Sequence, residues 1–383
     1  MTGWSGRRIL GNLLFEEELA AKPVTPSRSA LATAAGAATL LRAFASDGDR
    51  LWTPAPVAPE RLVPLPYLPI PELESGPLER LPPVDEVLAW GETPAVAAHR
   101  LRRPPAPLPD LEAPLHELLW RVPPAPPTVV AAVHHRAFCL EVARSLHRAL
   151  PGARMVSSPA ELEGEAGNWV LKAPLSAAGR SRYRHPAGES LAEPAVRRRI
   201  ERLFEHHGPL LFEPWMERTD DFGCVAVVTP DGLRLAGFHR LLVDGRGQFT
   251  GIELAPTFQG FDGLTGEERA AMEEALDATA RALRQAGYSG PFGVDAWRYR
   301  GPHLRDGGTL FHPLGEINAR LTFGLVARVL LDRWVDRWRG LLGLLPGHRI
   351  RLVLGRRTPG GSLPLLVDTE ETSGAAWLIA KSF

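Results

Sequence analysis

Two hairpin patterns in the second half of the chain argue against a doubly wound parallel sheet. Strands are predicted at 223–229 and 233–243, with the turn Pro230-Asp231-Gly232 between them. A second pair is predicted at 293–300 and 309–317, joined by a Gly-rich turn. Between and after them the apolar residues recur at helical spacing, which predicts covering helices. Antiparallel strands mixed with covering helices indicate an α+β protein.

The sequence changes character near residue 128. The first 127 residues are rich in Pro, which fixes φ and removes a backbone donor, so short elements separated by surface connections are expected there. In this part we predict a helix at 29–44, a strand at 49–53 and a helix at 94–102. From residue 128 on, the further predicted strands are 128–133, 154–158, 169–173 and 210–214, and the predicted helices are 136–150, 194–207, 267–286 and 324–342.

Three units follow from this division. Residues 1–127 are expected to form a smaller Pro-rich α/β domain, residues 128–345 the main domain, and residues 346–383 a short β appendage. Strands are predicted in the appendage at 348–354 and 363–367. Two positions for it stay open, over the functional site or along an edge of the sheet.

Composition excludes several partners. The 383 residues carry 44 basic and 44 acidic side chains, so there is no overall attraction to nucleic acid or to an anionic membrane. No run approaches the roughly 18 apolar residues of a membrane span, and the acidic 16–18 segment is wrong for a signal peptide. We therefore expect a cytoplasmic protein. Cys139 and Cys224 are expected to be buried free thiols, and the oligomeric state stays open.

Lys172 is the first candidate for phosphate binding. Lys occurs at only three positions, and one of them ends a buried strand directly before the loop Ser176-Ala-Ala-Gly-Arg-Ser181. Small residues let backbone amides approach an anion, and a Lys ammonium suits phosphate oxygens. The alternative is an ordinary loop with Lys172 at an exposed strand end. The P-loop and dinucleotide motifs are not present.

The segment Leu210-Leu-Phe-Glu-Pro-Trp-Met-Glu217 predicts a strand that leaves its sheet at a Glu-Pro pair. Backbone groups freed there can pair with the edge of an adenine base, and a nearby carboxylate such as Asp221 can hold ribose hydroxyls. An edge strand with an acidic turn is the alternative interpretation.

The most specific pattern pairs Phe292-Gly-Val-Asp-Ala-Trp297 with Leu314-Gly-Glu-Ile-Asn-Ala-Arg320. Residues two apart on a strand share a face, so Glu316 and Asn318 lie side by side, and the hairpin brings Asp295 opposite them. Two carboxylates and an amide oxygen together suit Mg²⁺ when phosphates complete its coordination. Arg320 falls on the same face and can neutralise a phosphate or a carboxylate. A solvated polar face is the alternative.

The order of these pieces resembles the ATP-grasp superfamily over residues 128–342. The resemblance implies two α+β subdomains that grip ATP, with the Pro-rich α/β domain before them. The segment Ile9-Leu-Gly-Asn-Leu-Leu-Phe-Glu-Glu-Glu-Leu19 is similar to the pre-ATP-grasp region of some family members.

The resemblance also implies roles for single residues. Lys172 would contact the α- and β-phosphates, with Arg136 as a second phosphate ligand by its position. Ser176, Ala177, Ala178 and Gly179 would close over the β/γ end. The adenine would be lined by Glu213, Pro214, Trp215 and Met216, and Asp221 would lie near the ribose. Asp295, Glu316 and Asn318 would hold one or two Mg²⁺ ions, with Mn²⁺ as an alternative, and Arg180 and Arg320 would stabilise the transferring phosphoryl group.

The function implied is that of an ATP-dependent, ADP-forming carboxylate-amine ligase that works through an acyl phosphate. Its substrates would be a small carboxylate, with an amino acid or peptide as one candidate, and an amine. Two alternatives stay open: an ATP-grasp kinase or phosphotransferase, and a non-catalytic ATP-binding protein. For substrate binding we point to the adjacent His239 and Arg240, whose alternative is a partly buried polar pair in an amphipathic strand.

Overall fold

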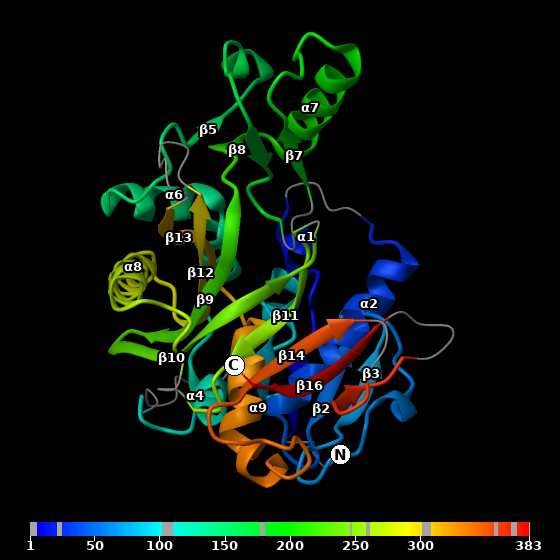
Figure 1. Cartoon of the computed structure of the whole chain (residues 1–383). Coiled ribbons are helices and arrows are strands. Elements are labelled where there is room, and N and C mark those ends of the chain that lie inside the picture. Colours follow the sequence, from blue (N-terminus) through cyan, green and yellow to red (C-terminus); the bar gives the residue numbers. More distant parts are fainter. Residues whose placement is uncertain are drawn as a thin grey trace.

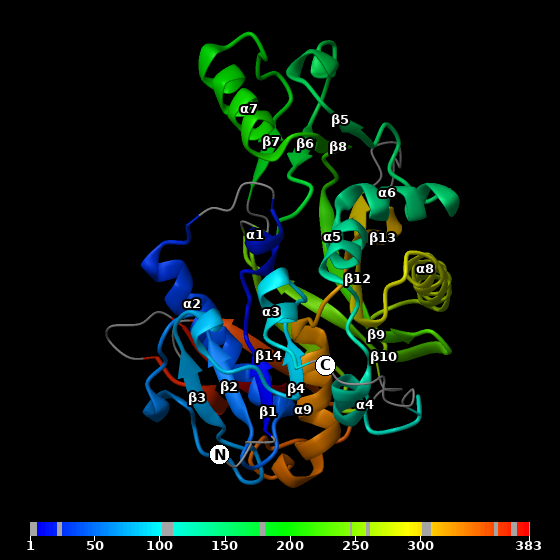
Figure 2. The same cartoon turned by 180° about the vertical axis from the view of Figure 1, so that it is seen from behind.

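The computed structural model describes residues 6–20, 25–101, 110–176, 181–245, 247–257, 261–300, 308–355, 359–368 and 374–382. Within these ranges the strands form three sheets, seen from the front in Figure 1 and from behind in Figure 2. No helix in the described ranges is both long and apolar enough to cross a membrane.

A parallel four-stranded sheet in the order β3-β2-β1-β4 lies in the N-terminal part (Figure 2). Its strands are β1 (Arg7–Leu10), β2 (Arg50–Thr53), β3 (Glu72–Ser75) and β4 (Glu86–Ala89). The other elements are α1 (Phe15–Leu19), α2 (Arg28–Ala38), η1 (Thr39–Phe44), η2 (Pro59–Arg61), η3 (Leu78–Arg80), α3 (Pro94–Ala98) and α4 (Leu115–Arg121). The predicted strand at 49–53 and helix at 29–44 are confirmed, the latter as α2 followed by η1. The predicted helix at 94–102 is shorter, because α3 ends at Ala98.

The second sheet is antiparallel, in the order β5-β8-β6-β7, and stands at the top of Figure 1. Its strands are β5 (Arg154–Val156), β6 (Trp169–Lys172), β7 (Arg182–His185) and β8 (Leu210–Pro214). Helix α7 (Pro194–His207) and η4 (Pro159–Leu162) cover it, and Ile200 packs with Trp169, Leu171 and Phe212 in its core.

The predicted strand at 128–133 is wrong, because this segment is helix α5 (Pro127–His134), followed by α6 (Arg136–Ser145). Its valines are typical of strands, but Pro127 occupies the first turn, where a missing N–H costs nothing. Val130 and Val133, three residues apart, then form one buried helix face. For such a short apolar run, burial in the tertiary structure decides between a helix and a strand.

The third sheet has eight strands in the order β13-β12-β9-β10-β11-β14-β16-β15, and every neighbouring pair is antiparallel. The strands are β9 (Arg218–Thr229), β10 (Gly232–Val243), β11 (Phe249–Leu254), β12 (Gly290–Arg300), β13 (Thr309–Asn318), β14 (Arg349–Gly355), β15 (Leu363–Leu366) and β16 (Ala375–Lys381). Both predicted hairpins are therefore confirmed. The last three strands extend the sheet beyond β11, so the predicted appendage covers a sheet edge.

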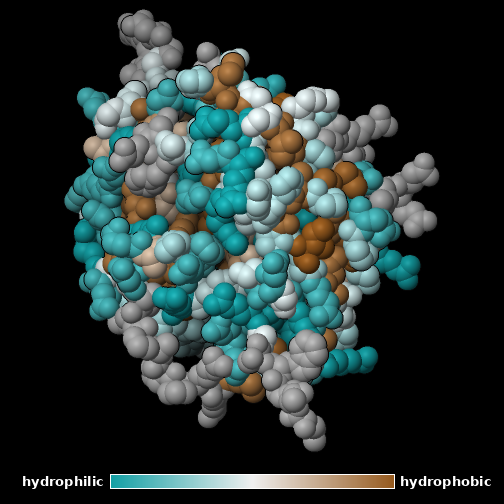
Figure 3. Space-filling model, turned by 90° about the horizontal axis from the view of Figure 1, so that it is seen from below, coloured by the Kyte–Doolittle hydropathy of each residue, from teal (hydrophilic) through white to brown (hydrophobic). Residues whose placement is uncertain are grey.

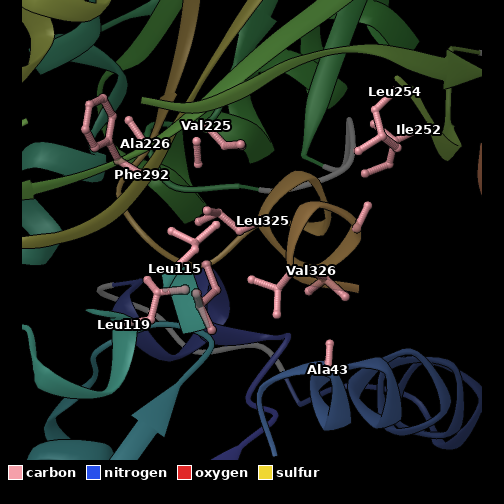
Figure 4. Packing of buried hydrophobic residues seen from close by; sticks show 14 of the residues in the cluster. Ala43, Leu115, Leu119, Val225, Ala226, Ile252, Leu254, Phe292, Leu325 and Val326 are labelled. Carbon is pink, nitrogen blue, oxygen red and sulfur yellow. The ribbon is translucent and has the colours of Figure 1, made fainter. Parts of the chain in front are cut away.

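Two helices pack on this sheet, α8 (Gly266–Gln285) and α9 (Phe323–Trp338). Helix α9 is buried on nearly all sides because it lies between the large sheet and the N-terminal elements (Figure 4). In that view Leu325 and Val326 lie among Val225 of β9, Leu115 of α4 and Ala43 of η1. The lower face in Figure 3 mixes hydrophilic and hydrophobic residues. The N-terminal part and the large sheet thus share one core, whereas the small antiparallel sheet has a core of its own.

Candidate functional site

Nine of the predicted site residues line one cavity of about 310 Å³, between the end of β6 and the face of the large sheet. Strands β9, β10, β12 and β13, the start of α9 and residues from the N-terminal part form its walls. The predicted residues that line it are Arg136, Lys172, Ser176, Asp221, His239, Asp295, Glu316, Asn318 and Arg320. Segments far apart in the sequence therefore meet here.

Lys172 ends β6 and forms an ion pair with Glu213 of the neighbouring strand β8. Their side chains are only 14% and 9% exposed. Burial lowers the pKa of Lys172, while the pKa of Glu213 lies below its usual value because Lys172 outweighs the effect of burial. The Glu213 carboxylate thus positions the Lys172 side chain.

The three predicted metal ligands lie together as the hairpin register requires. Asp295 of β12 is directly opposite Glu316 of β13, and the Asn318 amide donates to Asp295 Oδ2 at 3.2 Å. Burial and the neighbouring Glu316 raise the pKa of Asp295 to about 7. The pKa of Glu316 is lowered, because Arg136 and Lys172 outweigh its burial. Two carboxylates on directly opposite strand positions repel each other unless a cation or a proton lies between them.

This donor set fits Mg²⁺, which prefers a few protein oxygens and completes its octahedron with phosphate and water. Among the described residues no group of three or more His, Cys, Asp or Glu side chains is placed to hold a metal. The set offers two carboxylates and one amide, so it would bind Mg²⁺ firmly only with phosphate oxygens present.

Arg136 ties these groups to the loop after β6. It is buried at the start of α6, and its Nη1 lies 3.1 Å from Glu316 Oε2. Its Nε donates to the Ala173 carbonyl at 2.9 Å, and Nη2 to the Ser176 carbonyl at 3.2 Å. Arg136 thus links the carboxylate of β13 to the backbone that leads into the small-residue loop. Of that loop, Ala177, Ala178, Gly179 and Arg180 lie outside the described residues.

Arg320 lines the cavity and forms an ion pair with Glu16. The sequence interpretation missed this role of Glu16. Arg320 Nε donates to Glu16 Oε1 at 2.8 Å, and its guanidinium lies 5.0 Å from the centre of the Trp90 ring. His134 Nε2 faces the same Glu16 oxygen at 3.5 Å, while its Nδ1 accepts from the Ala319 amide. Glu16 is 1% exposed, and its other oxygen has no hydrogen-bond partner among the described residues. An element of the N-terminal part therefore positions Arg320.

This cluster predicts a pH-dependent contribution to stability. Burial alone would raise the pKa of Glu16, but Arg320 and His134 outweigh it and hold the pKa at about 2, against 4.5 ordinarily. The stabilisation is therefore present above pH 4.5 and is lost as the pH falls towards 2. At 1.36 kcal/mol per pH unit, Glu16→Gln is expected to lower the free energy of unfolding by about 3 kcal/mol at pH 7.

Urea denaturation of both proteins between pH 7 and pH 3.5 measures this difference. The difference in free energy of unfolding between the two proteins should be constant at neutral pH and should decrease below pH 4.5. Glu60→Gln, at an exposed position, is the control and should unfold like the wild type. A difference for Glu16→Gln that stays the same down to pH 3.5 would contradict the assignment.

The predicted adenine and ribose segment is placed beside the cavity. Asp221 accepts from Arg218 Nη1 at 3.0 Å, and the Arg218 guanidinium lies 3.6 Å from the centre of the Trp297 ring. Met216 packs against the same cluster as Trp297. The backbone N–H of Trp215 donates to the Asn168 carbonyl at 2.9 Å. It is therefore not free to pair with adenine, as was expected of the backbone groups after the Glu-Pro pair. Pro214, Trp215 and Met216 do not line the 310 Å³ cavity.

His239 and Arg240 point to opposite faces of β10, as adjacent strand residues must. His239 lines the cavity and is 5% exposed. Arg240 lies on the other face, where its Nη1 donates to Asp220 Oδ1 at 2.9 Å. The expectation that the two form one anion site is therefore corrected, since strand alternation separates them. Cys139 and Cys224 are buried and free, as predicted.

Comparison with protein-family models and with curated proteins gives no match. Several solved structures match along nearly the whole chain, including the following three. N5-carboxyaminoimidazole synthetase from Staphylococcus aureus, complexed with ADP, is 9% identical with a TM-score of 0.55, covering 100% of this chain and 95% of that chain. Phosphoribosylamine–glycine ligase from Thermotoga maritima is 16% identical with a TM-score of 0.55, covering 98% and 92%. N5-carboxyaminoimidazole ribonucleotide synthetase from Thermus thermophilus is 15% identical with a TM-score of 0.52, covering 98% and 94%.

These likenesses, at such low identity, define the fold. The protein is of the α+β class, with a small antiparallel sheet facing a larger one across a cavity and a parallel N-terminal sheet packed beside them. This is the ATP-grasp fold, as the order of motifs along the sequence predicted.

Proposed function

We propose that this chain is an ATP-dependent, ADP-forming ligase that joins a small carboxylate to an amine through an acyl phosphate. The observation that carries the proposal is the meeting of Lys172 and Arg136 with Asp295, Glu316 and Asn318 in one cavity of an ATP-grasp fold. Such a site holds cations for phosphate and oxygens for a divalent metal. No nucleophilic side chain is needed for this chemistry.

Three cations of the site are already matched to carboxylates. Lys172 pairs with Glu213, Arg136 with Glu316, and Arg218 with Asp221. In the proposed complex the phosphates of ATP take over the cations. Asp295, Glu316 and Asn318 would hold Mg²⁺, and the bound ion would neutralise negative charge on the phosphates. Arg136, released from Glu316, is then available to the phosphate chain, so nucleotide and metal reinforce each other's binding.

In each of the two steps one bond forms as another breaks, and the protein needs to supply only positive charge near the phosphates. A carboxylate oxygen of the acid attacks the γ-phosphorus, the bond to the β-phosphate oxygen breaks, and ADP leaves. The amine nitrogen then attacks the acyl carbon, inorganic phosphate leaves with the former carboxylate oxygen, and the nitrogen loses a proton. Lys172 and Arg136 offset the negative charge that builds up during phosphoryl transfer, which is the main requirement of this step.

The remaining predicted roles belong to the same proposal. Ser176 and the loop up to Gly179 close over the β/γ end, with Arg180 on the transferring group. The backbone from Glu213 to Met216 lines the adenine, and Asp221 holds the ribose. Arg320, positioned by Glu16, faces the acid. The name of the Thermotoga protein of the same fold, phosphoribosylamine–glycine ligase, states an amine and an acid, which supports this class of substrates.

Transfer of ¹⁸O from the acid to phosphate tests the proposal directly. The protein is incubated with Mg-ATP, hydroxylamine as a general amine, and pools of carboxylic acids labelled with ¹⁸O in the carboxylate. Because the acyl phosphate passes one carboxylate oxygen to phosphate, we expect ¹⁸O in the inorganic phosphate, and a hydroxamate, for the pool that contains the substrate.

Phosphate release without ¹⁸O would show simple ATP hydrolysis. Stable phosphorylation of a hydroxyl compound in the same assay would identify a kinase. Either result would overturn the ligase proposal. Nucleotide binding by Lys172 and Arg136 would then be retained as a separate property, measured by titration with ADP.

A further inference from the structure

The face of the large sheet that looks into the cavity changes from polar to apolar across the strands. Strands β12 and β13 contribute Asp295, Glu316 and Asn318, whereas β10 and β11 contribute Leu241, Val243, Phe249 and Ile252. The register places Leu241 opposite Ile252 and Val243 opposite Phe249. The apolar side chains thus form one continuous patch beside the proposed reaction centre.

Aromatic rings from outside the sheet close this patch. The Phe249 ring stacks on Phe323, the first residue of α9, with centroids 5.7 Å apart and planes 12° apart. The Trp90 ring lies 5.0 Å from the same Phe323 ring. Val243 is nevertheless 44% exposed. Apolar walls left partly open inside a cavity are typical of ligand sites.

His239 lies at the boundary between the two halves. It sits opposite Gly223, which is opposite Asp295 on the other side, so His239 and Asp295 flank one glycine with about 10 Å between their backbones. A Cβ on Gly223 would lie 2.5 Å from His239 Nε2. The imidazole therefore leans over Gly223 towards Asp295, and glycine is needed there to leave room for it.

His239 is a buried polar side chain that lines the cavity. It is 95% buried, and no hydrogen bond to it is found within the described ranges. Burial lowers its pKa to about 4, so the ring is neutral and can donate one N–H. Its Cε1 is close to the start of the 16-residue helix α9, where a Cβ on Gly324 would lie 2.6 Å away. In this first turn the Leu325 N–H already donates to the Thr322 hydroxyl, while the other N–H groups have no intrahelical acceptor and favour an anion.

Building on the proposed function, we propose that this half of the cavity binds the acid substrate, and that the acid carries an apolar body, aromatic or branched. Its carboxylate lies between His239, the start of α9 and the reaction centre at Asp295. Its body lies against Leu241, Val243, Phe249, Ile252 and Phe323. A small polar acid such as glycine leaves this surface uncovered, so it is a poor substrate.

Calorimetric titration of acids into the protein with Mg²⁺ and a non-hydrolysable ATP analogue tests this without turnover. The series is butyrate, hexanoate, 4-methylpentanoate and phenylpropionate, with glycine and succinate as polar comparisons. Each buried methylene is expected to strengthen binding about fourfold. We expect the phenyl or branched acid to bind at least tenfold more tightly than either polar acid.

Adjacent leucines provide matched variants. Leu241 faces the cavity, whereas Leu242 points to the opposite face of β10, and both are partly exposed. Leu241→Asn is expected to weaken binding of the apolar acids at least tenfold, and Leu242→Asn to leave it unchanged. His239→Leu should weaken binding of an acid about tenfold and not that of the corresponding alcohol.

The outcomes separate this inference from the proposed function. Equal or tighter binding of glycine or succinate, no binding of any acid, or an equal effect of the two Asn variants would each overturn the inference. If the apolar acids bind as expected but give no ¹⁸O transfer, the ligase proposal falls and the binding site stands. If ¹⁸O transfer occurs with polar acids alone, the ligase stands and the apolar site falls.

Discussion

Glu316→Gln is expected to lower the rate of ADP formation at least roughly 10²- to 10³-fold, the usual effect of removing one group that stabilises charge in a transition state. The substitution keeps the shape and the hydrogen-bonding capacity of the side chain towards Arg136, 3.1 Å away. It removes one negative charge from the pair with Asp295, and with it half of the carboxylate charge that would hold Mg²⁺. The Mg²⁺ concentration needed for half-maximal rate should rise as well.

The measurement is kcat at saturating ATP over a range of Mg²⁺, with the thermal midpoint of each variant recorded to exclude unfolding. Glu217→Gln is the control, because Glu217 is 67% exposed and pairs with Arg300 at the surface, so the rate of this variant should match the wild type. A Glu316→Gln protein that is folded and retains more than about a tenth of the rate would remove Glu316 from the proposed metal site.

Lys172→Met is expected to affect both stability and nucleotide binding. Removing one partner of a buried ion pair costs about 3–5 kcal/mol, because the other charge stays buried and unpaired. Glu213, 9% exposed, would be that charge. In the double variant Lys172→Met with Glu213→Gln no charge is orphaned, so most of the lost stability should return. ATP binding should not return, since the ammonium is still missing.

Chemical denaturation of the wild type, both single variants and the double variant forms a double-mutant cycle for this pair. Nucleotide titration of the same four proteins gives the second readout. Recovery of stability without recovery of ATP affinity supports the assignment of Lys172 to the phosphates. Recovery of both in the double variant would mean that Lys172 acts only as the partner of Glu213.

The hairpin of β12 and β13, which carries the proposed metal ligands, was the most predictable part of the molecule. Strand alternation placed Glu316 and Asn318 on one face, and the hairpin required a partner residue opposite them, which the register shows to be Asp295. Lys172 was singled out because Lys is rare in the chain and because this one lies at a strand end, and both features can be read from the sequence alone. The weak prediction was the apolar run at 128–133, where length and valine content favour a strand and burial of one helix face overrules them.

The partners of these residues were not predictable. Nothing near Arg320 in the sequence points to Glu16, 304 positions away. The acidic run around Glu16 served only as an argument against a signal peptide and as part of the segment that is similar to pre-ATP-grasp regions. Arg218 and Trp297 stack because β9 and β12 are neighbours, a fact of strand order. The pair His239 and Arg240 was read as one site because the residues are adjacent, although adjacency on a strand separates side chains.

The sequence by itself determined which residues of each strand share a face, because a period of two is a property of the extended backbone. It also determined the fold, through the order of its motifs. Only the tertiary structure decided which charges are paired, since Lys172 with Glu213 and Arg320 with Glu16 join elements whose contact depends on packing. It also decided where the polar face ends and the apolar patch around Leu241 begins, because that boundary runs across strands and no local pattern records the order of strands in a sheet.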